Sequence, residues 1–354
     1  MIINDQNDHS KREVIREKFL ADNIVIIDGF PGCGKTLFGP IISSYDRVEI
    51  MQYMFEIEFI CRLRHLGKIS TDATISMIRM LSDHKLYQSM MGRDTNFRYR
   101  DLSSVFKYHS PLKYLKRIFQ AGDMVVPDRI NSSKPILSFV SHDLFSYSEP
   151  VFEALNDRLT FIEIVRHPLY MIIQQTLNME RLFRGSEARD IQIYFEYQNN
   201  EMPYFCQGWE DQYISSNNID RAIYSIYHAN KLSAKMRSRV KTDYKKTRYL
   251  KVPFEKFVID PYPYLDLFSS NLSSKINKDT TKALKEQNVP RKKIADGIPL
   301  EIYQRCGWEP SDENLSEEEE LEKRRSWAVE MGATEQALDV LDMMSKEYTE
   351  QNLR

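Results

Sequence analysis

The chain has 354 residues, of which 42% are hydrophobic and 28% are charged, so it is long enough for one large α/β domain or two small ones. Its formal net charge of -2 gives no basic field for nucleic acid, and its 4 cysteines form no C-x-x-C pair that would indicate a zinc site or a disulfide framework. The polar Met1–Ser10 lacks a signal core and no stretch approaches the ~20 apolar residues of a membrane helix, so we expect a cytoplasmic protein without a membrane span.

The first two predicted elements are an amphipathic helix over Ser10–Ala21 and a buried strand over Ile24–Asp28. The helix is indicated by apolar residues that would share one side: Val14, Ile15, Phe19 and Leu20. The strand is indicated by four consecutive apolar residues, which suit a parallel strand that is covered on both faces.

A glycine-rich loop follows this strand, with the pattern G-x-x-x-x-G-K-[ST] over Gly29–Thr36. Its glycines let the backbone turn tightly, so that several N–H groups point into one concavity. Lys35 adds a positive charge at the mouth of that concavity, and Thr36 opens a helix whose N-terminus favours an anion. A chance glycine turn is a poorer interpretation, because the strand, the glycines, the lysine and the threonine all fall in register. The stretch therefore predicts a phosphate-binding loop.

Helices dominate the next part of the chain. We expect a helix at Thr36–Ser44, a second strand at Arg47–Met51, and then helices at Met51–Leu66, Thr71–Met90 and Ser110–Phe119. Because no turn-punctuated strand pattern separates the later helices, residues 52–120 are predicted to form a helical insertion.

Regular alternation of strands and helices then resumes. Strands are predicted over Pro135–Val140, Leu159–Val165 and Thr247–Pro253, and helices over Pro150–Leu155, Leu169–Phe183 and Ile219–Lys241. This alternation predicts an α/β fold with a central, mostly parallel sheet and helices on both faces. Residues 1–310 would form this single domain. An acidic run followed by basic residues predicts a helical tail over 311–354, packed on or flanking the domain.

Reactive groups follow three of the predicted strands, and ligands of parallel sheets bind beyond the carboxyl ends of the strands. Lys35 in the glycine loop would neutralise a transferring group, and Arg166 would pair with a second phosphate. His142 could accept a proton from an acceptor hydroxyl. The structural alternatives are that His142 caps a turn and that Arg166 pairs with Glu163. Matching positions at three strand ends favour a site, provided that the strands are neighbours.

Four motifs in this order and spacing resemble the PAPS-dependent sulfotransferases, a branch of the P-loop fold. Phe30–Thr36 lies in register with the family's loop P-[KR]-S-G-T-[TS], and Ser138–His142 is similar to its strand ending in K-T-H. Ile164–Pro168 is similar to its R-[DN]-P motif, and Val252–Pro261 to its Y-E-D-L stretch with an aspartate-proline. The resemblance covers roughly 23–268 apart from the insertion. It implies a P-loop-type three-layer fold.

The resemblance also implies the roles of the site residues. PAPS (3′-phosphoadenosine 5′-phosphosulfate) would be the donor, with PAP as product and no metal. Catalysis would fall to His142 as base and to Lys35. The donor would be held by Pro31, Gly32, Cys33, Gly34, Lys35, Thr36, Arg166 and Gln174. Arg166 would bind the 3′-phosphate.

Four features depart from the family pattern. Gly32 stands where the family has lysine or arginine, and Lys35 stands where nucleoside triphosphate loops have theirs. Gln174 replaces the family's serine, and the late R-K-G segment has only a loose counterpart in Arg291–Lys293 with Gly297.

The acceptor would be a carbohydrate or a small hydroxylated molecule. The insertion and the polar loop Glu187–Asn218 would shape its pocket, the latter with aromatic side chains that suit a sugar face: Tyr194, Tyr197, Tyr204, Phe205 and Trp209. In some carbohydrate-acting relatives an early glutamate is the base, so Glu56 or Glu58 could replace His142. The oligomeric state stays open.

Two other functions remain open. An ATP- and Mg²⁺-dependent kinase would use Lys35 on the phosphates and Thr36 on the metal. Against a kinase, the sequence shows no convincing strand that ends in a metal-binding aspartate. Met124–Asp128 is the nearest candidate, and its proline weakens it as a central strand. A non-catalytic nucleotide-binding module could contact a partner through Met51–Leu66, although core packing explains that stretch more simply.

Overall fold

Five parallel strands form the centre of the molecule, in the order β2-β3-β1-β4-β7. The computed structural model describes residues 12–183 and 190–354 of the chain. The strands are β1 (Ile24–Asp28), β2 (Gln52–Tyr53), β3 (Leu137–Val140), β4 (Leu159–Val165) and β7 (Arg248–Pro253). This sheet confirms the predicted α/β fold class, and the bounds of β1 and β4 are those predicted.

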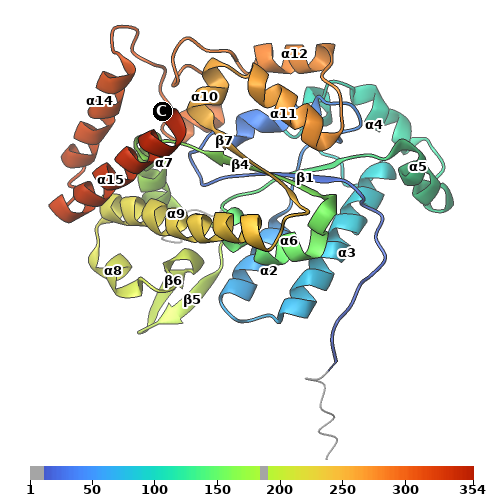
Figure 1. Cartoon of the computed structure of the whole chain (residues 1–354), viewed down its shortest axis with the longest axis horizontal. Helices are drawn as coiled ribbons and strands as arrows, with labels where there is room; N and C mark the ends of the chain where they lie inside the picture. The colour runs from blue at the N-terminus through green and yellow to red at the C-terminus, as the bar shows by residue number, and fades with distance from the viewer. Residues whose placement is uncertain (1–11, 184–189) are drawn as a thin grey trace, which may run out of the picture.

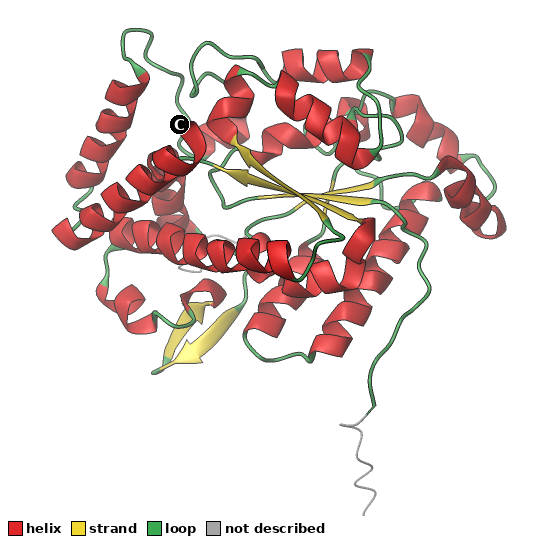
Figure 2. Ribbon diagram, viewed as in Figure 1, coloured by secondary structure: helices red, strands yellow, loops and turns green. Residues whose placement is uncertain are grey.

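Helices cover both faces of the sheet (Figures 1 and 2). One layer holds α1 (Phe38–Ser43), α10 (Phe254–Ile259), α11 (Tyr262–Leu272) and α12 (Lys278–Glu286). The other holds α2 (Phe55–His65), α3 (Thr71–Met90), α6 (Glu149–Leu155) and α9 (Asn218–Thr242). Successive residues of a strand point to opposite faces, and accordingly Val25 and Ile27 join one hydrophobic core while Ile24 and Ile26 join the other.

The chain before β1 is not the predicted helix. Ser10 lies outside the described residues, and residues 12–19 run without regular secondary structure. Val14 and Ile15 stay 52% and 71% exposed, so the apolar side expected of a helix finds no core. Instead, Asp83 on α3 accepts hydrogen bonds from the backbone N–H groups of residues 20 and 21, which fixes the segment as an extended strap.

The predicted helices of residues 52–120 are present. They are α2, α3 and α4 (Pro111–Ile118), and the bounds of α3 are those predicted. The strand predicted over Arg47–Met51 is misplaced along the chain. Within this range only Val48 forms an isolated bridge, and the strand that pairs with β3 is β2. Met124–Asp128 is also not a strand: it runs through a 3₁₀ turn into α5 (Val126–Ser133), so Asp128 does not end a strand of the sheet.

The region predicted as a polar loop over Glu187–Asn218 contains regular structure. Residues 184–189 lie outside the described part, and the rest forms an antiparallel hairpin of β5 (Tyr194–Tyr197) and β6 (Asn200–Pro203), followed by α8 (Glu210–Ser215). The prediction failed because the aromatic residues pack inward. Trp209 is only 6% exposed and its indole N–H donates to the carbonyl of Phe205.

Two helices lie within the last part of the chain, α14 (Glu317–Glu330) and α15 (Glu335–Tyr348), after the short α13 (Glu301–Arg305). Both pack on α7 (Pro168–Arg181), and α15 also packs on α9 (Figure 1). Ala328, Leu341 and Met344 belong to the same hydrophobic core as β1. Across the described residues, no helix is both long and apolar enough to span a bilayer.

Candidate functional site

The predicted site residues gather at one edge of the sheet, because β3, β1 and β4 are neighbours and run in the same direction. The loops after these strands border a cavity of about 990 Å³. All but one of the predicted residues line it: Pro31, Gly32, Gly34, Lys35, Thr36, His142, Arg166 and Gln174. The condition that the three strands be neighbours is therefore met.

The glycine loop owes its path to two residues in the left-handed region, Gly32 with φ 96° and Gly34 with φ 86°. A Cβ atom on Gly34 would come within 2.3 Å of the Phe254 ring, so the close approach of α10 also requires glycine there. Cys33 is the predicted residue that does not line the cavity. Cys33 is 1% exposed and burial raises the pKa of its thiol, so its side chain belongs to the core.

Lys35 is 5% exposed, and its ammonium has no hydrogen-bond or ion-pair partner within residues 12–183 and 190–354. Its nearest opposite charges are the carboxyl groups of Asp28 and Asp143. Asp28 ends β1 and holds the turn after β3: it accepts hydrogen bonds from Ser141 Oγ (2.7 Å) and from the N–H groups of residues 144 and 145 (3.1 and 2.8 Å). Asp28 therefore fixes the position of the His142 turn relative to Lys35.

His142 is held by a buried carboxylate. Its Nδ1 lies 3.2 Å from Glu58 Oε1, and its backbone N–H donates to the same oxygen at 3.0 Å. The ring packs beside those of Tyr53 and Phe55, each with its centroid 5.7 Å away. Arg62 donates to the other Glu58 oxygen and to the His142 carbonyl. With Nδ1–H donated to Glu58, Nε2 is the nitrogen that can accept a proton.

This geometry distinguishes the two glutamates considered as bases. Glu58 is 1% exposed and bonded on both oxygens, which suits a residue that orients His142. Glu56 is exposed and lines neither cavity near His142. Sequence reasoning missed Asp143, whose side chain accepts a hydrogen bond from Ser146. Burial, with the nearby charge of Asp28, raises the pKa of Asp143 to about 7.

Arg166 faces the cavity rather than a carboxylate partner. The alternative pairing with Glu163 is not formed, because Glu163 binds Arg237 at 2.8 Å. Arg166 Nη1 donates to the Gly32 carbonyl at 3.0 Å, and its buried Nε has no hydrogen-bond partner among the described residues. Burial lowers the pKa of this guanidinium.

Two further arginines line the same wall, Arg291 and Arg324. Arg291 was singled out by the family resemblance, and Gly297 lines the cavity with it. Lys293 is directed elsewhere, since its ammonium donates to the carbonyls of Asp312 and Leu315. Arg324 on α14 carried no local sequence signal, because its place in the wall depends on how α14 packs on α7.

A second cavity of about 350 Å³ shares Pro31, His142 and Gln174 with the first, so His142 is accessible from both. Much of its lining is apolar: Phe30, Phe55, Leu177, Leu182, Phe183 and Phe205. Of the aromatic residues predicted to shape an acceptor pocket, Tyr204 and Phe205 line this cavity, whereas Tyr194, Tyr197 and Trp209 do not.

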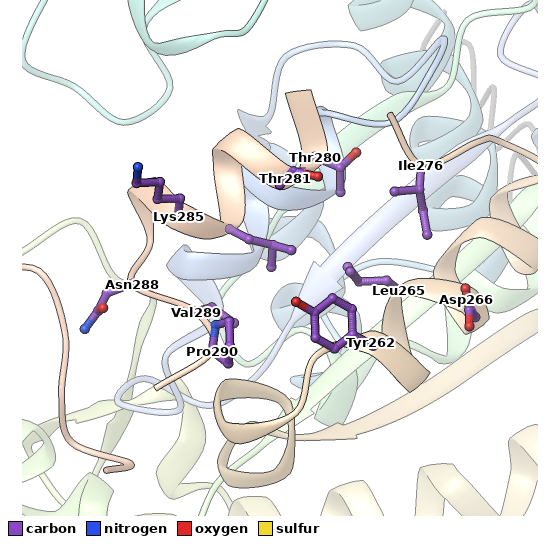
Figure 3. A pocket seen from close by; sticks show the side chains of 11 residues that line it. Tyr262, Leu265, Asp266, Ile276, Thr280, Thr281, Lys285, Asn288, Val289 and Pro290 are labelled. Carbon is purple, nitrogen blue, oxygen red and sulfur yellow. The ribbon is translucent and has the colours of Figure 1, made fainter. Parts of the chain in front are cut away.

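A separate cavity of about 480 Å³ lies between α11 and α12 (Figure 3). Tyr262 and Asp266 come from α11, and Thr281 and Lys285 from α12. It contains none of the predicted site residues and shares no lining residue with the other two cavities.

No protein-family model matches this chain, and no curated protein does. Among solved structures, the chain is similar to the sulfotransferase domain of the Synechococcus PCC 7002 olefin synthase, with a TM-score of 0.40 and 13% identity over 92% of this chain and 99% of that one. The sulfotransferase domain of the curacin biosynthetic pathway gives 0.40 and 11%, over 87% and 97%. The sulfotransferase STF9 from Mycobacterium avium gives 0.36 and 12%, over 90% and 78%.

All three are sulfotransferases.

Proposed function

We propose that this protein is a sulfotransferase that moves a sulfuryl group from PAPS to the hydroxyl group of an acceptor. The observation that carries the proposal is the Glu58–His142 pair, placed where the two cavities meet and beside the loop that holds Lys35. A carboxylate that orients an imidazole is the arrangement expected of a general base. The larger cavity, at about 990 Å³, has room for a nucleotide.

The residues of the larger cavity fit the donor. The glycine loop and the unpaired ammonium of Lys35 suit the phosphosulfate group, since both supply N–H donors to an anion. The unpartnered Nε of Arg166 suits the 3′-phosphate, because the planar guanidinium matches phosphate oxygens. Gln174 can donate an amide N–H to either group. When bound, PAPS supplies an activated sulfuryl group.

The chain's own residues would then manage the proton and the developing charge. His142 Nε2 accepts the proton of the acceptor hydroxyl while the acceptor oxygen bonds to sulfur and the bond from sulfur to the phosphate oxygen breaks. Glu58 stabilises the imidazolium that forms. Lys35 stabilises the negative charge that develops on the departing phosphate oxygen.

The acceptor would bind in the smaller cavity. Its apolar side chains favour a hydroxyl compound with an apolar body over a carbohydrate, since three of the aromatic residues that suggested a sugar face, Tyr194, Tyr197 and Trp209, do not line this cavity. The polar groups beside His142, which include Asn178 and Gln192, would orient the reacting end.

The test is binding of PAP, PAPS and ATP with Mg²⁺, measured by the rise in melting temperature at saturating ligand. We expect PAP and PAPS to stabilise the protein without Mg²⁺, and Arg166→Ala to lose most of that stabilisation. Stabilisation by ATP with Mg²⁺ alone would overturn the proposal in favour of a kinase that uses Lys35 and Thr36. Turnover of PAPS with a hydroxyl acceptor, abolished in His142→Ala while PAP still binds, would separate an enzyme from a nucleotide-binding module.

A further inference from the structure

Arginine and aromatic side chains alternate along one wall of the larger cavity. The Arg291 guanidinium lies 5.5 Å from the centroid of the Phe254 ring, and that of Arg166 lies 4.3 Å from the same ring. Arg166 also lies 4.8 Å from the centroid of Tyr170, and Arg324 lies 4.5 Å from it. The wall thus brings three cations together on two rings, from the loop after β4, from the loop after α12 and from α14.

Carboxylates only partly offset these charges. Arg324 forms an ion pair with Glu320 at 2.6 Å, while Arg291 donates its N–H groups to backbone carbonyls. The carboxylate of Glu255 interacts electrostatically with Arg166. This carboxylate already accepts hydrogen bonds from the backbone N–H of His167 and from the hydroxyl of Tyr348.

Two N–H groups of this wall are buried without a partner among the described residues. They are the Nε groups of Arg166 and Arg324. A buried donor without an acceptor costs free energy, and so does the approach of like charges, so a bound anion would relieve both. Because the guanidinium groups of Arg166 and Arg324 both lie within 5 Å of the Tyr170 centroid, one anion at this place could accept from both arginines.

The first residue of helix α14, Glu317, makes two hydrogen bonds that fix the position of the helix and therefore of Arg324. Glu317 Oε2 accepts a hydrogen bond from the Tyr170 hydroxyl at 2.7 Å, and Glu317 Oε1 accepts one from the backbone N–H of Ile294 at 3.0 Å. One carboxylate thus connects α14 to α7 and to the segment that follows Arg291.

We propose that Arg324 is a third cationic contact, with Arg166 and Arg291, for a phosphate monoester, and that α14 is therefore part of the nucleotide site. A phosphate monoester carries about -1.5 to -2 charges and three acceptor oxygens, which matches several guanidinium groups better than a singly charged anion does. The inference rests on the proposed function in one respect: the monoester is taken to be the 3′-phosphate of the donor.

The test compares Arg324→Gln with Lys323→Gln, an equal change of charge at an exposed neighbour on the same helix that does not line the cavity. Calorimetry would give the dissociation constants of PAP, of 5′-AMP, which lacks the 3′-phosphate, and of inorganic phosphate. We expect Arg324→Gln to weaken PAP binding roughly 10- to 100-fold, the effect of one charge-assisted hydrogen bond, and to leave 5′-AMP unchanged. Lys323→Gln should change neither, and inorganic phosphate alone should bind far more weakly than PAP.

Unchanged PAP affinity in Arg324→Gln would overturn this inference while the proposed function stands. Failure of the unaltered protein to bind PAP or PAPS would overturn the proposed function itself. If Arg324→Gln lowers the melting temperature without ligand, Arg324→Lys serves instead, because lysine can keep the ion pair with Glu320 but lacks the planar fork. Hydrogen exchange gives an independent readout: PAP should slow exchange of the α14 amides in the unaltered protein and less so in the variant.

Discussion

Single side chains at the edge of the sheet act through partners that are far away in the sequence. Glu58 and His142 are 84 residues apart, and Asp28 is 113 residues from the Ser141 hydroxyl that it binds. The sequence predicted that Lys35, His142 and Arg166 lie together, and they line one cavity, because each follows a strand in a recognisable pattern. It left Glu56 and Glu58 as equal alternatives, because their burial depends on how α2 packs.

The first prediction concerns Glu58→Gln. The substitution keeps the size of the side chain but removes the charge that orients and stabilises protonated His142, so we expect kcat to fall roughly 10²- to 10⁴-fold. The KM for PAPS should stay nearly unchanged, because Glu58 does not line the larger cavity. Glu56→Gln is the matched control on the same helix. Equal activity of the two variants would show that Glu58 does not support the base.

The second prediction concerns the pH dependence of stability through Asp143. Its pKa is raised from 3.8 to about 7 in the folded protein, so the native state binds the extra proton between these values. The stability contributed by this proton is full below pH 3.8 and is lost as pH rises through about 7. Asp143→Asn should therefore stabilise the protein by about 1–3 kcal/mol near pH 8 and by little near pH 4.

Urea unfolding at several pH values checks this prediction. Asparagine tolerates the left-handed backbone at this position, where φ is 54°, and its carbonyl can still accept from Ser146. A stability difference that is the same at every pH would show that the pKa of Asp143 is the same in the folded and the unfolded chain.

Whole elements were predictable where one local pattern determined them. The bounds of β1, β4 and α3 follow from a continuous apolar run or from a capped helix, in which Ser70 accepts a hydrogen bond from the N–H of Ala73. The segment before β1 failed because Asp83, more than 60 residues away, satisfies its backbone in extended form. The hairpin of β5 and β6 was not predicted, because its aromatic residues lie among polar residues and the stretch was interpreted as a polar loop.

The third prediction concerns how α4 is attached to the sheet. Glu49 binds Lys113 at 2.8 Å and both Nη atoms of Arg117, while the Tyr114 hydroxyl donates to it at 2.6 Å. Breaking this buried cluster leaves a guanidinium without its counter-charge, so Glu49→Gln should lower the free energy of unfolding by about 3 kcal/mol at neutral pH.

The pH dependence has a definite sign. Burial alone would raise the pKa of Glu49, but the charges of Lys113 and Arg117 outweigh it and lower the pKa from 4.5 to about 2. The stabilisation is therefore full above pH 4.5 and is lost as pH falls through about 2. Chemical unfolding of both proteins between neutral and acidic pH should show curves that converge in acid; parallel curves would contradict the assignment.

For the whole molecule, the topology of the sheet could be inferred only in outline. Alternating strands and helices predicted a parallel sheet, and the strand order then places three loops at one edge. The sequence did not reveal the contribution of the last helices to the cavity, because the acidic run at Glu317 looks like an exposed helix end. In the structure that glutamate connects Tyr170 with the backbone of Ile294.

The fourth prediction follows from the packing of these helices. A protein ending at residue 310 would expose the core positions now covered by Ala328, Leu341 and Met344, and would leave Glu255 without the Tyr348 hydroxyl. We expect it to aggregate or to melt well below the full chain, and to lose PAP binding. The measurements are solubility, a melting curve and calorimetry. A soluble, cooperatively folded product that binds PAP would show that residues 1–310 are an independent domain.

The contact between Tyr348 and Glu255 also has a consequence for synthesis on the ribosome. Glu255 accepts a hydrogen bond from the backbone N–H of His167. It accepts another from the hydroxyl of Tyr348, which is synthesised 93 residues later. The glycine loop and all five strands of the sheet therefore leave the ribosome well before the wall that carries Arg324 can form. A nascent chain therefore has its glycine loop early, whereas the cavity wall that carries Arg324 is complete only after α15 has emerged and docked.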